Sequence, residues 1–195
     1  MENIKEATKQ FLELKRQACV ESKRKNSEVI AIGASKTRSI QSIRESYEAG
    51  IKNFGENYLQ EAIEKINELQ DLDLQWHFIG PIQSNKTRQI AENFDWVQSV
   101  DRAKLLTRLD QQRTSHLGPL NVCIQLNLFN EPQKKGASEQ ELMSLLELAD
   151  KLPHINLRGL MIIPPKCDKF EAQRKQFKRI RQVFDSVKSH YPNMD

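Results

Sequence analysis

The chain has 195 residues, and its 30 lysines and arginines against 26 aspartates and glutamates give a formal net charge of +4. At about 150 residues per domain, this length predicts one domain over residues 1–195. Hydrophobic residues make up 38% and charged residues 29% of the chain. This composition is typical of a soluble globular protein and excludes a disordered or collagen-like chain.

The sequence carries no signal for a membrane or for export. Its longest uncharged apolar stretches are far shorter than the ~20 residues that cross a bilayer, and the first 17 residues mix charges with apolar side chains, unlike a secretory signal. Cys19, Cys123 and Cys167 lie far apart, and no cysteine or histidine pair has zinc-ligand spacing. We therefore expect a cytoplasmic protein with free thiols, without a metal and without membrane contact.

Helices and strands alternate along the chain. Apolar residues at helical spacing predict a first helix over residues 2–25. Runs of β-branched and apolar residues then predict strands over 29–35, 52–57, 74–80, 95–100, 119–129 and 155–164. Further helices are predicted over 39–50, 58–70, 87–94, 102–116, 138–152 and 170–191. Ser39 is a candidate N-cap, and Ser138 with Glu141 matches a capping box.

This alternation predicts parallel strands joined by right-handed crossovers. A doubly wound sheet and a (β/α)8 barrel both satisfy it. No GxGxxG motif follows the first strand, which weakens a dinucleotide-binding interpretation. Six strand–helix units are two short of a closed barrel.

Lys36 is the most interesting candidate for chemistry, because it ends the first predicted strand at the edge where such folds place their active sites. By strand alternation it shares an apolar face with Ile32 and Ala34. Partial desolvation there would favour the neutral amine that a Schiff base needs. The alternative is an ordinary loop lysine with its head group in solvent, and the pattern alone favours that alternative.

Other polar residues follow strands at the same edge, among them Glu56, Asn57, Gln125 and Asn127. They could line the mouth of a ligand site or serve as caps and loop turns, and the pattern does not choose between these. His77, between two aromatic residues, fits a packed core histidine at least as well as a ligand contact.

Positive charge is concentrated in residues 23–26, in the two lysines of the loop over 130–136, and on the last helix. The loop lysines could attract a phosphate, and the other patches could contact RNA or an acidic partner. Solvated surfaces explain them better, because no aromatic residues are interleaved with the basic ones of the last helix as base stacking would require. We expect no nucleic-acid partner.

Three longer motifs carry a family resemblance: AIGASKT at 31–37, FGENYLQEAIEKI at 54–66 and QWHFIGPIQSNK at 75–86. With QLNL, KKG and RGLMIIP in the same order, they resemble the YggS/PROSC family of pyridoxal 5'-phosphate homeostasis proteins, over nearly the whole chain. The resemblance implies an α/β fold, a (β/α)8 TIM barrel of the alanine racemase N-terminal type, with about six of the eight βα units in this chain.

The resemblance also implies the site and the function. Lys36 matches the lysine that binds pyridoxal phosphate as a Schiff base, and Asn57 and His77 match positions in the cofactor pocket. The expected role is binding and buffering of the cofactor without catalytic turnover, in a monomer that supplies pyridoxal-phosphate-dependent enzymes. The alternatives are a racemase-like enzyme acting on amino acids, and a basic binding module without the cofactor.

The sequence departs from the family at its end. The family's GMSxD-type segment and VRIG-type strand, which supply the last two strands and the main phosphate-binding amides, do not occur here. We therefore expect the barrel domain to be incomplete at its C-terminal end, with unpaired strand edges. From this we expect weak binding of pyridoxal phosphate, or none, by the 195-residue chain.

Overall fold

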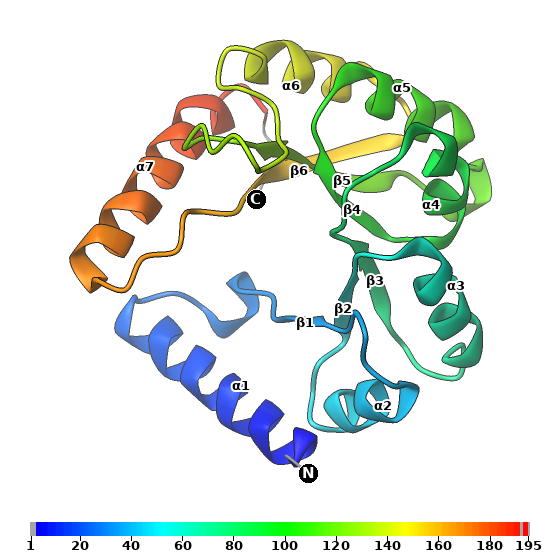
Figure 1. Ribbon diagram of the computed structural model, residues 1–195, viewed down its shortest axis with the longest axis vertical. Helices are drawn as coiled ribbons and strands as arrows, with labels where there is room; N and C mark the ends of the chain where they lie inside the picture. The colour runs from blue at the N-terminus through cyan, green and yellow to red at the C-terminus, as the bar shows by residue number, and fades with distance from the viewer. Residues whose placement is uncertain (1–2, 192, 195) are drawn as a thin grey trace. The chain divides into compact units, whose positions relative to one another are not determined.

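The computed structural model describes residues 3–191 and 193–194. It divides into two compact units, Met1–His77 and Phe78–Asp195. Both are built from alternating strands and helices, as Figure 1 shows. The predicted helix over 2–25 begins at a residue that lies outside the described part of the chain.

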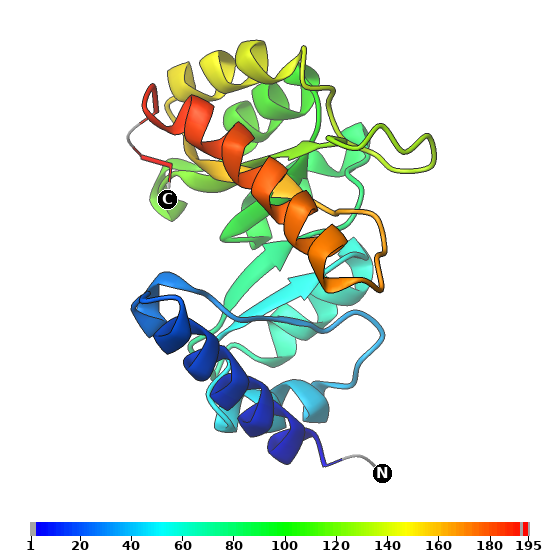
Figure 2. The same ribbon diagram turned by 90° about the vertical axis from the view of Figure 1, so that its left-hand side faces the viewer.

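In its described residues, the first unit contains three α-helices and three strands: α1 (Ile4–Glu21), β1 (Ile32–Ala34), α2 (Ile40–Glu48), β2 (Asn53–Glu56), α3 (Leu59–Glu68) and β3 (Gln75–Phe78), whose last residue belongs to the second unit. A 3-10 turn, η1 (Asn26–Glu28), links α1 to β1. Strands β1 and β2 pair in parallel, with Ala34 opposite Gly55. Helices α1 and α2 lie side by side (Figures 1 and 2).

The core of the first unit lies between its strands and helices. Phe54 of β2 and Trp76 of β3 are buried, and their ring centroids lie 6.1 Å apart. Ile43 of α2 and Ala62 of α3 are buried as well. Each of these helices therefore turns its apolar stripe toward the strands, as the sequence periodicity predicts.

The second unit continues the alternation: η2 (Ser84–Lys86), α4 (Thr87–Asn93), β4 (Trp96–Val100), α5 (Ala103–Gln112), η3 (Ser115–Leu117), β5 (Leu120–Leu126), α6 (Leu142–Lys151), β6 (Ile155–Ile162) and α7 (Phe170–Lys188). Strand β5 pairs in parallel with β4 and with β6. Strand β5 and helices α5 and α6 each contribute several buried side chains to the core of this unit.

Every described strand and α-helix falls within a range that the sequence predicts, and the parallel pairing is confirmed for these strand pairs. The elements are shorter than predicted at their ends. Helix α6 begins at Leu142, although both bonds of the capping box form: the Ser138 N–H donates to Glu141 Oε2 at 2.9 Å, and the Glu141 N–H donates to Ser138 Oγ at 3.3 Å. None of the described helices is long and apolar enough to cross a membrane.

Candidate functional site

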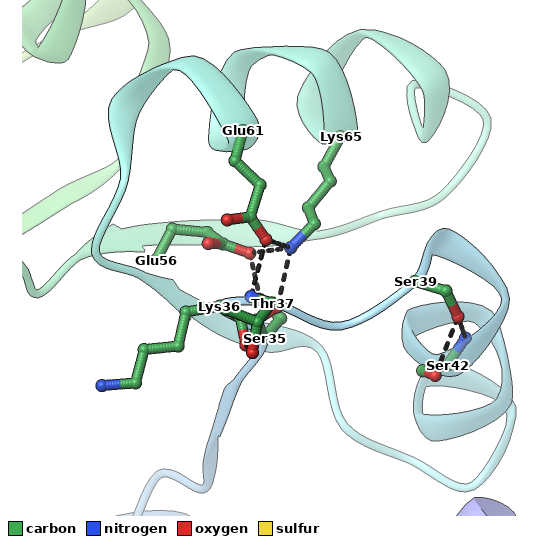
Figure 3. A network of polar contacts seen from close by, with 8 residues as sticks. All are labelled: Ser35, Lys36, Thr37, Ser39, Ser42, Glu56, Glu61 and Lys65. Atoms are coloured by element: carbon green, nitrogen blue, oxygen red, sulfur yellow. Dashed lines mark hydrogen bonds and ion pairs between the residues drawn. The ribbon is translucent and has the colours of Figure 1, made fainter.

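Lys36 lies in a turn immediately after β1. The turn is closed by the Arg38 N–H, which donates to the Ser35 carbonyl at 3.0 Å. The Lys36 side chain is exposed, and Figure 3 shows it extending away from the polar residues beside the turn. This exposure agrees with the loop lysine that the pattern alone favours. The alternative, partial desolvation on an apolar face, is not found, because β1 ends at Ala34 and strand alternation no longer applies at residue 36.

Thr37, the next residue, has a backbone φ of +62°. This left-handed region is unfavourable for a β-branched side chain, so the conformation must be held by its surroundings. The Thr37 N–H donates to Oε1 of Glu61 on α3 at 2.7 Å. A charged acceptor therefore holds the backbone directly beside Lys36.

Four residues, Ser35, Glu56, Glu61 and Lys65, form a polar network under this turn, here called the Lys65 cluster (Figure 3). Lys65 Nζ donates to Glu56 Oε1 at 2.7 Å, to Glu61 Oε1 at 2.5 Å and to the Ser35 carbonyl at 2.7 Å. The Ser35 hydroxyl also donates to Glu56 Oε1, at 2.8 Å. All three ammonium donors are thus used, as a buried charge requires.

The charges of the cluster are buried to different degrees. The side chains of Glu56, Lys65 and Glu61 are 0%, 6% and 30% exposed. The pKa of Glu61 is held below its ordinary value, chiefly by the hydrogen bond from Lys65. Glu56 is among the polar residues expected from the sequence, whereas Glu61 and Lys65 were missed; the signal that could have found them is their i, i+4 spacing on a predicted helix.

Asn57 follows β2, as Lys36 follows β1. The Ser35 N–H donates to the Gly55 carbonyl at 3.0 Å, which extends the β1–β2 pairing toward both residues. Asn57 Oδ1 and Glu56 Oε2 are buried acceptors without a hydrogen-bond partner among the described residues. Such atoms are uncommon in folded proteins, and they fit a ligand that supplies hydrogen-bond donors at this strand edge.

His77 lies in β3 and is 1% exposed. Its Nε2 is 2.9 Å from Asn53 Oδ1 on β2. Burial lowers the pKa of His77 to about 4, so that the imidazole is neutral at pH 7. The packing favours the interpretation of His77 as a core histidine, and its contact with a cofactor stays a prediction.

The polar residues at the end of β5 organise their own loop in the second unit. Asn127 Nδ2 donates to the carbonyls of Glu131 at 2.9 Å and Lys134 at 3.2 Å, and Gln125 Nε2 donates to the carbonyl of Lys135 at 3.1 Å. Lys134 forms a 2.6 Å ion pair with Glu131. For Asn127, the interpretation as a loop-turn residue is therefore favoured over that of a ligand contact.

Two further features concern possible ligands. No cluster of three or more histidine, cysteine, aspartate or glutamate residues in the described part of the chain could hold a metal. A cavity of about 390 Å³ in the first unit lies beside β1 and helices α1 and α2. Ser35 and Arg38 line it, whereas Lys36, Asn57 and His77 do not.

Comparisons with known proteins give the chain a family. The alanine racemase N-terminal domain model matches residues 15–194. The pyridoxal phosphate homeostasis protein of Haemophilus influenzae is 46% identical over 178 residues, which is 90% of this chain and 75% of that protein. The protein of the same name from Pseudomonas aeruginosa is 49% identical over 168 residues, covering 86% of this chain and 73% of that protein.

Solved structures agree on the fold. PipY of Synechococcus elongatus, described with pyridoxal phosphate bound, is 35% identical with a TM-score of 0.77, covering 92% of this chain and 83% of that chain. Alanine racemase of Clostridium difficile, at 12% identity and a TM-score of 0.74, covers 97% of this chain and 50% of its own, and shows the fold alone. The fold predicted from the sequence motifs is thereby confirmed. The chain belongs to the alanine racemase N-terminal domain family and, within it, to the YggS/PROSC group of pyridoxal phosphate homeostasis proteins.

Proposed function

We propose that this chain binds pyridoxal 5'-phosphate through a Schiff base on Lys36 and serves its intracellular homeostasis rather than catalysis. The names of the relatives, and the PipY structure with pyridoxal phosphate bound, support the cofactor. The observation that carries the assignment to Lys36 is its position: it is an exposed primary amine in a turn that is held at both flanking residues. This turn follows β1, and Asn57, which has a buried open acceptor, follows the paired strand β2.

The residues present fit the cofactor. Pyridoxal phosphate, when bound, supplies an aldehyde that condenses with a primary amine and releases water. Lys36 provides an accessible amine for this condensation, and Asn57 Oδ1 can accept a hydrogen bond from the ligand. His77 is neutral because its pKa is about 4, so a contact between its imidazole and the cofactor would add no positive charge.

The proposal is tested by incubating the chain with pyridoxal phosphate, reducing with borohydride and mapping the modified peptides. Reduction converts a Schiff base into a stable secondary amine. Because binding by this 195-residue chain is expected to be weak, we expect partial labelling, concentrated on the Lys36 peptide and lost in Lys36→Ala. Lys9→Ala is the matched control, since Lys9 is an exposed lysine on α1. Labelling spread evenly over the exposed lysines would contradict the proposal.

A homeostasis role also predicts that bound cofactor is released intact to enzymes that use it, from a monomer in the cytoplasm. Alanine racemisation or transamination by the chain that is lost in Lys36→Ala would instead show an enzyme. The choice against an enzyme rests on the relatives, which are named for homeostasis.

A further inference from the structure

We propose that Glu61 and Lys65 of α3, together with Glu56 of β2, act as a positioning clamp that sets the backbone conformation at Lys36. This inference rests on the proposed function of Lys36 and deepens it: Glu61 and Lys65 act through the turn that carries the reactive amine, and Glu56 holds Lys65 in place.

The first step is that the turn needs support. Thr37 holds a φ of +62°, a region in which a β-branched residue is an outlier. Type II turns normally place glycine or asparagine at such a position. A conformation of this kind persists only when surrounding contacts fix it, and such residues are concentrated at functional sites.

The second step is that the contacts reach both neighbours of Lys36 and come from one helix. Lys65 Nζ donates to the carbonyl of Ser35, on one side, and Glu61 Oε1 accepts the N–H of Thr37, on the other. Glu61 and Lys65 are four residues apart on α3 and are joined to each other at 2.5 Å. The backbone of Lys36 is thus held at both ends by a single rigid element, while its side chain stays free to extend (Figure 3).

The third step is that the clamp is itself locked in place. Glu56 has no exposed surface and accepts hydrogen bonds from both Lys65 and the Ser35 hydroxyl. Lys65 donates to both Glu56 and Glu61, so its removal would leave two acidic side chains close together without the donor that they share. The network is therefore a stiff connection between α3 and the turn.

The test separates the clamp from overall stability by changing Glu61, which is only partly buried, instead of Lys65, whose removal could unfold the chain. Glu61→Ala removes the acceptor of the Thr37 N–H. Glu61→Gln keeps an amide oxygen that can accept it. Glu64→Ala is the matched control, because Glu64 is exposed on the same helix and its carboxylate accepts only from Gln60 among the described residues. Thermal unfolding of each variant checks that the fold is retained.

Two readouts are compared. The first is hydrogen exchange at the Thr37 amide in the chain without cofactor. The second is the ratio of borohydride-trapped pyridoxal phosphate on Lys36 to that on the exposed Lys9. In Glu61→Ala we expect exchange to rise by about tenfold or more and the labelling ratio to fall severalfold. In Glu61→Gln, the exchange rate and the labelling ratio should lie close to those of the unaltered chain. In Glu64→Ala, neither quantity should change.

The clamp is wrong if Glu61→Ala leaves Thr37 exchange unchanged. It is also wrong if exchange at the Thr37 amide becomes faster while Lys36 is still labelled in clear preference to Lys9. In that case Glu61 would order the turn without affecting the reaction of the Lys36 amine. If the unaltered chain shows no preference for Lys36, the proposed function fails by itself. The role of the clamp in holding the turn is then tested by hydrogen exchange alone. Faster exchange at the Thr37 amide in Glu61→Ala would support that role, and unchanged exchange would overturn it.

Discussion

At the scale of single residues, His77 links the stability of this protein to pH. Burial favours its neutral form and lowers its pKa from 6.5 to about 4. As pH falls through 6.5, the imidazole of His77 becomes protonated in the unfolded chain but stays neutral in the folded chain, so the unfolded state gains stability. The contribution of His77 to the free energy of unfolding is present in full above pH 6.5. Up to roughly 3 kcal/mol of that free energy is lost as pH falls to about 4.

The expected result is a free energy of unfolding that falls between pH 7 and pH 4.5, measured by urea denaturation, with a smaller fall in His77→Gln. Carboxylates also titrate toward the lower end of this range, so the difference between the two proteins isolates the histidine. His116→Gln, which changes an exposed histidine, should follow the unaltered chain. Equal slopes for all three proteins would show that burial of His77 does not restrict its protonation.

At the same scale, the Lys65 cluster shows how a buried charge can be tolerated. Lys65 has three donors and each meets an oxygen, two of them carboxylate oxygens. These three hydrogen bonds compensate for the water that the buried ammonium group has lost. The same contacts place charged groups beside the backbone of Lys36, so an arrangement that the buried lysine needs for its own stability also orders the turn.

At the scale of secondary-structure elements, a single arginine ties together the end of α5, the end of α4 and the loop before β5. Arg113 follows α5 and is 8% exposed. Its guanidinium donates to the carbonyls of Ala91 and Phe94, at 2.5 and 2.9 Å, and to those of Leu117 and Gly118, at 3.1 and 2.8 Å. These carbonyls include groups left unpaired where a helix ends.

Arg113→Met is therefore expected to destabilise the protein by roughly 3–5 kcal/mol, because it leaves several carbonyls without a donor. Urea denaturation measures this change. Arg88→Met is the matched control: Arg88 on α4 is exposed and has a 3.6 Å ion pair with Glu92, and we expect its loss to change stability by less than about 1 kcal/mol. Similar effects of the two substitutions would refute the role given to Arg113.

At the scale of the whole molecule, the net charge of +4 is modest, and part of the basic surface of α7 is neutralised. Arg179 pairs with Glu139 at 2.6 Å, and Arg181 pairs with Asp185 at 2.7 Å. We therefore expect only weak binding to RNA. Its affinity should fall steeply between 50 and 200 mM salt, as counterion release predicts, and should be the same for the unaltered chain and for Lys36→Ala. Fluorescence anisotropy with a labelled single strand measures it; tight, salt-resistant binding would contradict this expectation.

The sequence by itself determined the order and type of the described elements and the family. Apolar periodicity and β-branched runs are local properties, so the six strands and the helices between them could be predicted from neighbouring residues. The motifs around Lys36, Asn57 and His77 fixed the family for the same reason, since they are read directly from the chain. Element ends shifted by a few residues, because fraying and caps depend on local hydrogen bonds that periodicity does not describe.

Only the tertiary structure decided what surrounds Lys36. Ser35 and Lys65 are 30 residues apart, and Thr37 and Glu61 are 24 apart. They meet because β1 pairs with β2 and α3 follows β2 directly. Exposure of Lys36 and the positive φ of Thr37 likewise depend on where β1 stops. Contacts across such separations arise from packing in three dimensions, and no pattern along the chain specifies them.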